Sequence, residues 1–162
     1  MMKLCSDVLK ALEGKTLVTA ESLTGGGIGG ALTSVPGASK VFKGGVISYT
    51  DEVKREVLSV PAADLTTFGA VSAPVAAAMA RGVRELLKAD VAVSVTGLAG
   101  PDGDDFGHEV GTVFIALATE GETFVREIHL GERRTRSFIR RMAGNYAFDM
   151  MRRHLSDKAV LY

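Results

Sequence analysis

Thr19-Ala20-Glu21-Ser22-Leu23-Thr24-Gly25-Gly26-Gly27 is the most informative stretch of this chain. The apolar pair Leu17-Val18 before it predicts a short buried strand, and the glycines predict a helix that begins directly afterwards. Where a strand ends and a helix begins, backbone N–H groups lack intrahelical partners and can bind an anion. The stretch therefore predicts a site where hydroxyls, a carboxylate and free N–H groups meet.

Ser22 and Thr24 each have a structural interpretation beside the chemical one. Thr24 suits the N-cap of the helix, and Ser22 suits a turn in which its hydroxyl bonds to nearby backbone. The glycine density favours chemistry, since each glycine within a helix costs about 1 kcal/mol relative to alanine. Glycine is kept where another group must approach the backbone closely. We therefore expect Thr24 to cap the helix and Ser22 to be free to act as a nucleophile.

The rest of the chain alternates between helical and strand patterns. Helices are predicted near 3–13, 24–34, 51–58, 62–68, 72–87 and 132–155, and strands near 17–20, 46–49, 91–95, 112–118 and 123–130. The last two strands flank Glu120-Gly121-Glu122, which predicts a hairpin and hence an antiparallel pair. This order predicts an α/β fold with helices on both faces of a mixed sheet. No linker or repeat divides the chain, so we expect one domain over residues 1–162.

Composition excludes several classes of function. Lys plus Arg and Asp plus Glu both number 19, so no excess of positive charge indicates a nucleic-acid partner. No apolar run approaches the ~20 residues needed to span a bilayer, and the N-terminus lacks the apolar segment of a secretion signal. Cys5 is the only cysteine and cannot form an internal disulfide. We therefore expect a cytoplasmic protein without nucleic-acid or membrane partners.

Polar clusters follow three of the predicted strands. The first strand is followed by Glu21, Ser22 and Thr24, the second by Tyr49, Asp51 and Lys54, and the third by the loop 96–103. Ligands of open α/β sheets bind beyond the carboxyl ends of the strands. If these strands run parallel, the three clusters meet in one cleft.

A nucleophilic serine requires a base. A Ser-His-Asp arrangement is possible in principle, but His108 is the one histidine in a plausible loop, and no G-x-S-x-G elbow is present. Tyr49 and Lys54 are better candidates, because a lysine desolvated in a cleft can lose its proton near neutral pH. The alternative for Lys54 is a solvated residue on a helix surface.

The loop Thr96–Gly103 offers backbone donors for an oxyanion, or is simply a connection rich in turns. Its acidic residues do not form a calcium loop, since Phe106 takes the third ligand position of an EF-hand pattern. Zinc-ligand spacing is absent as well. We therefore expect neither a metal nor a cofactor.

Five arginines mark the first half of the last predicted helix: Arg133, Arg134, Arg136, Arg140 and Arg141. At 3.6 residues per turn, Arg140 lies beside the apolar stripe of that helix, whereas Arg141 falls near the opposite side. A cleft arginine pairs well with a phosphate, so Arg140 is the predicted phosphate ligand. The other four are expected to be solvated.

These pieces together resemble the CinA C-terminal domain family, the nicotinamide-nucleotide amidohydrolases. The resemblance covers residues from about 4 to 155 and rests on residues 19–26, Ser48-Tyr49-Thr50-Asp51-Glu52-Val53-Lys54, Gly69-Ala70-Val71-Ser72, residues 96–103, Val110-Gly111-Thr112-Val113 and Arg140-Arg141-Met142-Ala143. It implies a three-layer α/β/α domain with a mixed, mostly parallel sheet, a homodimer, and a nucleotide as the small-molecule substrate.

The resemblance also implies a reaction, the deamidation of nicotinamide mononucleotide to nicotinate mononucleotide and ammonia, as in NAD recycling. Ser22 would attack the carboxamide carbon, and Tyr49 and Lys54 would assist proton transfer. Thr96 would help to hold the oxyanion. The implied substrate-binding residues are Thr24, Gly25, Gly26, Gly97, Gly100 and Arg140.

Departures from the family pattern leave alternatives open. Leu23, Asp51 and Ser59 replace residues common in the family, and the loop 104–109 differs. Asp51 would weaken the binding of an anionic substrate or raise the pKa of Lys54. One alternative is therefore a non-catalytic member that binds a nucleotide or a partner. Another is a dinucleotide-binding module, because Gly25, Gly27 and Gly30 match G-x-G-x-x-G.

Overall fold

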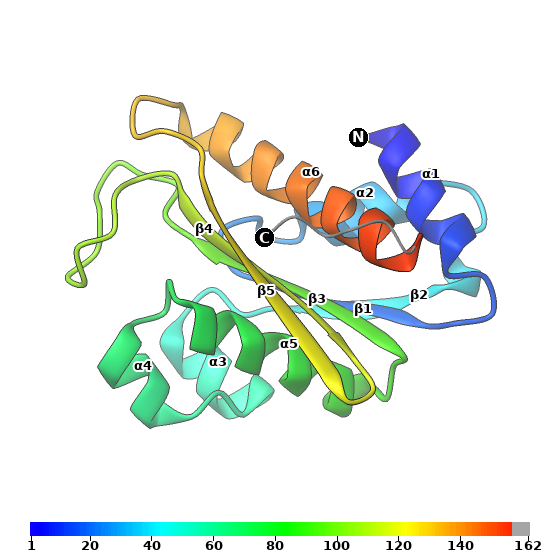
Figure 1. The fold of residues 1–162 in the computed structure, drawn as a ribbon, viewed down its shortest axis with the longest axis horizontal. Coiled ribbons are helices and arrows are strands. Elements are labelled where there is room, and N and C mark those ends of the chain that lie inside the picture. The colour runs from blue at the N-terminus through cyan, green and yellow to red at the C-terminus, as the bar shows by residue number, and fades with distance from the viewer. Residues whose placement is uncertain (157–162) are drawn as a thin grey trace.

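A five-stranded sheet forms the middle layer of the computed structural model, which describes residues 1–156 (Figure 1). The strands are β1 (Leu17–Glu21), β2 (Phe42–Ile47), β3 (Val91–Gly97), β4 (Thr112–Thr119) and β5 (Glu122–His129), in the order β2-β1-β3-β4-β5. β1 pairs in parallel with β2 and β3, whereas β4 is antiparallel to β3 and to β5. The predicted mixed sheet and the predicted hairpin are thereby confirmed.

Helices cover both faces of this sheet. They are α1 (Met2–Ala11), α2 (Gly27–Thr33), α3 (Asp51–Leu58), α4 (Ala62–Phe68), α5 (Ala73–Leu87) and α6 (Arg136–Leu155), with a 3₁₀ turn at Ala38–Lys40. α1, α2 and α6 lie on one face, and α3, α4 and α5 on the other (Figure 1). The three-layer α/β/α architecture is therefore confirmed.

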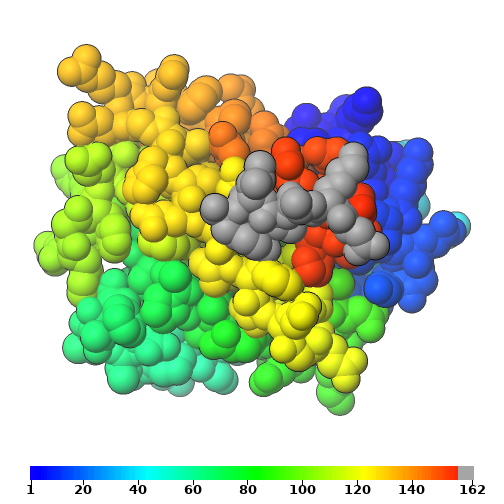
Figure 2. All heavy atoms as spheres, viewed as in Figure 1, coloured from blue at the N-terminus to red at the C-terminus, as the bar shows by residue number. Residues whose placement is uncertain are grey.

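The central strand β3 separates two apolar cores. Side chains alternate between the faces of a strand, so Val93 and Val95 join the core under α1 and α6, while Ala92 joins the core under α5. β5 lies at an edge of the sheet, and its atoms are visible between those of α5 and α6 when the molecule is drawn as spheres (Figure 2). Burial on both faces of β3 fixes the end of that strand, and with it Thr96 and Gly97.

Three elements begin at least three residues away from their predicted starts. β2 occupies residues 42–47 rather than 46–49. The prediction missed its first half because Lys43-Gly44-Gly45 lacks the β-branched residues that indicate a strand. α6 begins at Arg136 rather than 132, where Thr135 caps it by accepting a hydrogen bond from the N–H of Phe138. α2 begins at Gly27 rather than 24.

Two further statements concern the extent of the chain. The expected domain over 1–162 includes residues 157–162, which lie outside the described residues. Within residues 1–156, none of the helices has the length and apolarity required to cross a membrane.

Candidate active site

The carboxyl ends of β1, β2 and β3 meet at one edge of the sheet, because these strands run parallel. A cavity of about 290 Å³ lies there, between the β1–α2 turn, the residues after β2 and the loop after β3. The predicted site residues that line it are Ser22, Tyr49, Lys54, Thr96, Gly97 and Gly100. The expected cleft is therefore present, and it joins residues far apart in the sequence.

Lys54 is the central group of this cavity. Its side chain is 1% exposed, so the solvated alternative is wrong. Nζ donates to Oγ of Ser22 at 3.2 Å and to the backbone carbonyl of Ser48 at 2.7 Å. The lysine is carried by α3, which Thr50 caps by accepting a hydrogen bond from the N–H of Val53. A capped helix thus places an amine beside the serine hydroxyl.

Burial lowers the pKa of Lys54 below its ordinary value, since the protein interior solvates an ammonium poorly. The charge of Asp51 acts in the opposite direction, as expected from the sequence, but burial is the larger effect. A lowered pKa increases the fraction of neutral amine near neutral pH. A neutral amine can accept the proton of the Ser22 hydroxyl.

Glu21, not Thr24, supplies the partner for the start of α2. Its carboxylate is 2% exposed and accepts hydrogen bonds from the N–H groups of Gly26, Ile28 and Gly29, at 3.1, 3.0 and 2.9 Å. The predicted N-cap at Thr24 is therefore wrong. The reason is local: Gly25 and Gly26 have φ of 58° and 93°, which delays the helix until Gly27.

Thr24 and its two following glycines do not line the Ser22 cavity. The Thr24 hydroxyl is buried and has no hydrogen-bond partner within the described chain. The N–H of Gly25 donates to the carbonyl of Ser22, and that of Gly26 to Glu21. Among the described residues, the N–H groups of Leu23 and Thr24 have no acceptor. They directly follow Ser22 in the chain, and Leu23 also lines the cavity.

Gly97 and Gly100 do line the cavity, and their local surroundings differ. A Cβ on Gly97 would lie 2.7 Å from the carbonyl oxygen of Thr112, so the close approach of β4 requires glycine there. The carbonyl of Gly100 accepts a hydrogen bond from Arg136 at 2.6 Å.

Arg136 is the arginine of this cavity, and sequence reasoning missed it. Its second terminal nitrogen donates to the phenolic oxygen of Tyr49 at 2.8 Å. Arg140 lies one turn further along α6 and does not line the cavity; it bonds instead to the backbone of the β1–α2 turn. The predicted helix start at 132 hid Arg136, because the first turn of α6 is the part that reaches the site.

Tyr49 and Thr96 line the cavity, and the hydroxyl of each already forms a hydrogen bond within the protein. Tyr49 is 57% exposed, and its hydroxyl contacts Arg136 rather than Lys54 or Ser22. Thr96 is buried, and its hydroxyl donates to the carbonyl of Ala70 at 2.9 Å. The Thr96 oxygen therefore faces this site as an acceptor and not as a donor.

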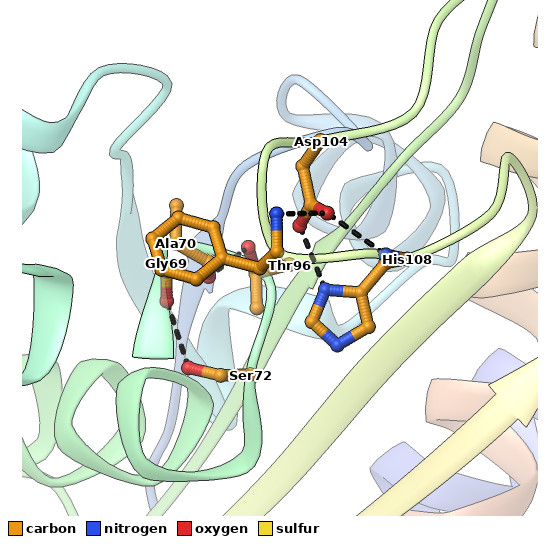
Figure 3. A network of polar contacts seen from close by, with 7 residues as sticks. Gly69, Ala70, Ser72, Thr96, Asp104 and His108 are labelled. Atoms are coloured by element: carbon orange, nitrogen blue, oxygen red, sulfur yellow. Dashed lines mark hydrogen bonds and ion pairs between the residues drawn. The ribbon is translucent and has the colours of Figure 1, made fainter. Parts of the chain in front are cut away.

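His108 serves the loop between β3 and β4 rather than the Ser22 cavity, which it does not line. Its Nδ1 lies 2.7 Å from the Asp104 carboxylate, which also accepts the N–H groups of Phe106 and His108 (Figure 3). Burial alone would raise the pKa of Asp104, but these hydrogen bonds outweigh it and lower that pKa. Asp104 thus ties together the loop that presents Gly100. Within residues 1–156, no cluster of three or more His, Cys, Asp or Glu side chains is arranged to hold a metal ion.

Known proteins share this architecture. The CinA C-terminal domain model matches residues 1–155. A CinA-like protein of Synechococcus sp. (strain CC9311) is 50% identical over 154 residues, which are 94% of this chain and 36% of that relative. A putative competence-damage inducible protein of Caldanaerobacter subterraneus subsp. tengcongensis is 44% identical over 155 residues, 94% of this chain and 37% of that relative. The chain thus spans about a third of the length of these curated relatives.

Solved structures agree with these relatives. The competence damage-inducible protein A of Klebsiella pneumoniae superimposes with a TM-score of 0.92 at 33% identity, covering 96% of both chains. The competence/damage inducible protein CihA of Agrobacterium tumefaciens gives 0.90 at 37% identity, covering 96% of this chain and 94% of its own. The family model covers nearly the whole chain, and the chain belongs to the CinA C-terminal domain family.

Proposed function

We propose that this chain is an amidohydrolase that converts nicotinamide mononucleotide to nicotinate mononucleotide and ammonia. The observation that carries the proposal is the contact between Nζ of Lys54 and Oγ of Ser22 at 3.2 Å in a buried site. A serine hydroxyl paired with an amine of lowered pKa is an activated nucleophile. The choice of substrate rests on the family resemblance.

In the first step, neutral Lys54 takes the hydroxyl proton while Oγ of Ser22 bonds to the carboxamide carbon. The carbonyl oxygen becomes an oxyanion, and the free N–H group of Leu23, a residue that lines the cavity, is the donor that would stabilise it. The Thr96 oxygen, whose proton is committed to Ala70, would accept a hydrogen bond from the substrate amide. The carboxamide is thus oriented by an acceptor at Thr96 and a donor at Leu23.

In the second step, the C–N bond breaks, and the leaving nitrogen takes the proton from Lys54 and departs as ammonia. Water then attacks the Ser22 ester with Lys54 again as the base, which releases the carboxylate and restores the serine. One lysine acts as base and then as acid in each half of the reaction.

The rest of the cavity suits a nucleotide of this shape. Leu23, Val71 and Leu98 offer apolar walls for a pyridine ring. Arg136, in the first turn of α6, places a guanidinium at the cavity, and guanidinium groups bind phosphate well. In this proposal Arg136 takes the phosphate role that the sequence assigned to Arg140.

The test is release of ammonia from nicotinamide mononucleotide by the purified chain, measured with and without EDTA. We expect release in both conditions, and no release from the nucleotide that already carries a carboxylate. Absence of ammonia with a folded protein that still binds the nucleotide would favour the non-catalytic alternative. Activity lost with EDTA and restored by a divalent cation would contradict the serine–lysine mechanism.

A further inference from the structure

We propose that Arg140 is a positioning residue that holds the turn carrying Ser22 in its reactive shape, an inference that rests on the proposed hydrolysis. Nε of Arg140 donates to the carbonyl of Leu23 at 2.9 Å, and Nη2 donates to the carbonyl of Thr24 at 3.3 Å. These are the two residues that directly follow Ser22. A side chain from α6 therefore binds the backbone of the nucleophile turn, across 117 positions of sequence.

The contact orients a backbone donor. A trans peptide unit is planar, and its C=O and N–H point in opposite directions. Because Arg140 binds the carbonyl of Leu23, the N–H of Thr24 in the same peptide unit points away from the guanidinium. That N–H has no acceptor within residues 1–156, and its peptide unit directly follows Leu23, which lines the cavity with Ser22. Groups that are fixed before the reaction stabilise developing charge without reorganisation. By fixing the peptide unit of Leu23, Arg140 holds the turn that places Ser22 and the Leu23 N–H at the cavity.

The turn is held from both sides. Glu21, at the end of β1, fixes the N–H groups of Gly26, Ile28 and Gly29. Arg140 fixes the residues between Ser22 and those groups. Glu21 is buried within the fold, whereas Arg140 is an exposed residue of α6. Replacing Arg140 therefore loosens the turn without opening the core.

Other uses of Arg140 fit the contacts less well. Its guanidinium does not line the Ser22 cavity, and within residues 1–156 it forms no ion pair with a carboxylate. A Cβ on Gly25 would lie 3.2 Å from Nη2 of Arg140, so the guanidinium packs closely on the turn itself. The geometry shows that this arginine binds the backbone of the turn.

The experiment compares Arg140→Ala with Arg141→Ala, its exposed neighbour on α6. A displacement of about 1 Å at a reacting group can lower a rate about 10²-fold. We expect Arg140→Ala to lower kcat by about 10- to 100-fold with little change in KM, and Arg141→Ala to behave as the unaltered protein. Added guanidinium chloride at non-denaturing concentration should restore part of the lost kcat in Arg140→Ala only. Arg140→Lys, which keeps the charge with a single nitrogen, should be intermediate and serves if the alanine variant does not fold.

A second readout separates this inference from the proposed function. A fluorophosphonate probe forms a bond between its phosphorus and Oγ of Ser22 and releases fluoride, so the labelling rate reports the reactivity of Ser22 with any substrate. Slower labelling of Arg140→Ala than of Arg141→Ala supports the inference, even if the unaltered protein releases no ammonia and the proposed function fails. Equal labelling and equal kcat in the two variants would overturn it. So would a rise in KM with kcat and labelling unchanged, which would make Arg140 a substrate ligand, or an unaltered protein in which Ser22 is not labelled at all.

Discussion

Replacing Lys54 by methionine removes the amine and keeps a flexible chain of similar length. Oγ of Ser22 then loses the base that is hydrogen-bonded to it, since Nζ of Lys54 lies 3.2 Å away. Loss of a general base costs typically about 10²- to 10⁴-fold in rate. We therefore expect kcat for ammonia release to fall by about 10²- to 10⁴-fold, with the nucleotide still bound.

The same substitution has a pH-dependent effect on stability. Methionine leaves the buried carbonyl of Ser48 without the donor that it has at 2.7 Å, which costs about 1–3 kcal/mol. Against this, it removes an amine whose pKa is lowered by burial. Between the lowered pKa of the folded state and the ordinary lysine pKa, the unfolded chain binds more protons, so the stability of the unaltered protein rises with pH in that window. Below the folded-state pKa, the folded protein bears the full cost of burying a charged amine, and above the ordinary lysine pKa this cost is absent. The methionine variant has no such cost at any pH.

The assay measures kcat at saturating nucleotide and the free energy of unfolding in urea at several pH values. Arg55→Met is the matched control, because Arg55 is the exposed neighbour of Lys54 on α3. The reasoning is refuted if folded Lys54→Met retains more than about a tenth of kcat. A stability difference from the unaltered protein that does not change with pH would refute the burial argument separately.

Three other substitutions test separate parts of the site. Asp51→Asn removes the charge that raises the pKa of Lys54, so the acidic limb of the plot of kcat against pH should move to lower pH; an unchanged or alkaline-shifted limb contradicts this. Arg136→Ala should raise KM by about 10- to 100-fold, as expected for a lost charge-assisted hydrogen bond of about 1.5–3 kcal/mol, whereas equal effects in the exposed Arg133→Ala would argue against a phosphate role. Glu21→Gln should lower the free energy of unfolding by at least about 1.5 kcal/mol in urea titrations, and a loss within error would show that the carboxylate does not anchor α2.

Much of the fold follows from local pattern. The apolar run of β3 and the hairpin at Glu120-Gly121-Glu122 were readable because burial on both faces and turn chemistry leave clear sequence signals. β2 was misplaced, because its ladder to β1 passes through Gly44 and Gly45, whose strand conformation depends on the neighbouring strand and not on their own propensity.

Part of the site was predictable in its residues, but its contacts were not. Polar clusters at strand ends indicated Ser22 and Lys54, and the parallel pairing brings them together. The exchange of roles between Arg136 and Arg140 could not be read, because it depends on where α6 begins and on which turn of the helix meets the cavity. The capping of α2 by Glu21 was also hidden, since two left-handed glycines displace the helix start.

The most direct test of the serine–lysine mechanism is the rate of ammonia release by Ser22→Ala, with nucleotide binding and melting temperature measured on the same sample. The exposed Ser39→Ala is the control. We expect the rate of Ser22→Ala to fall by roughly a factor of a thousand or more, with binding retained and the melting temperature nearly unchanged. If folded Ser22→Ala keeps most of its turnover, Ser22 is a structural turn residue and the covalent mechanism is wrong.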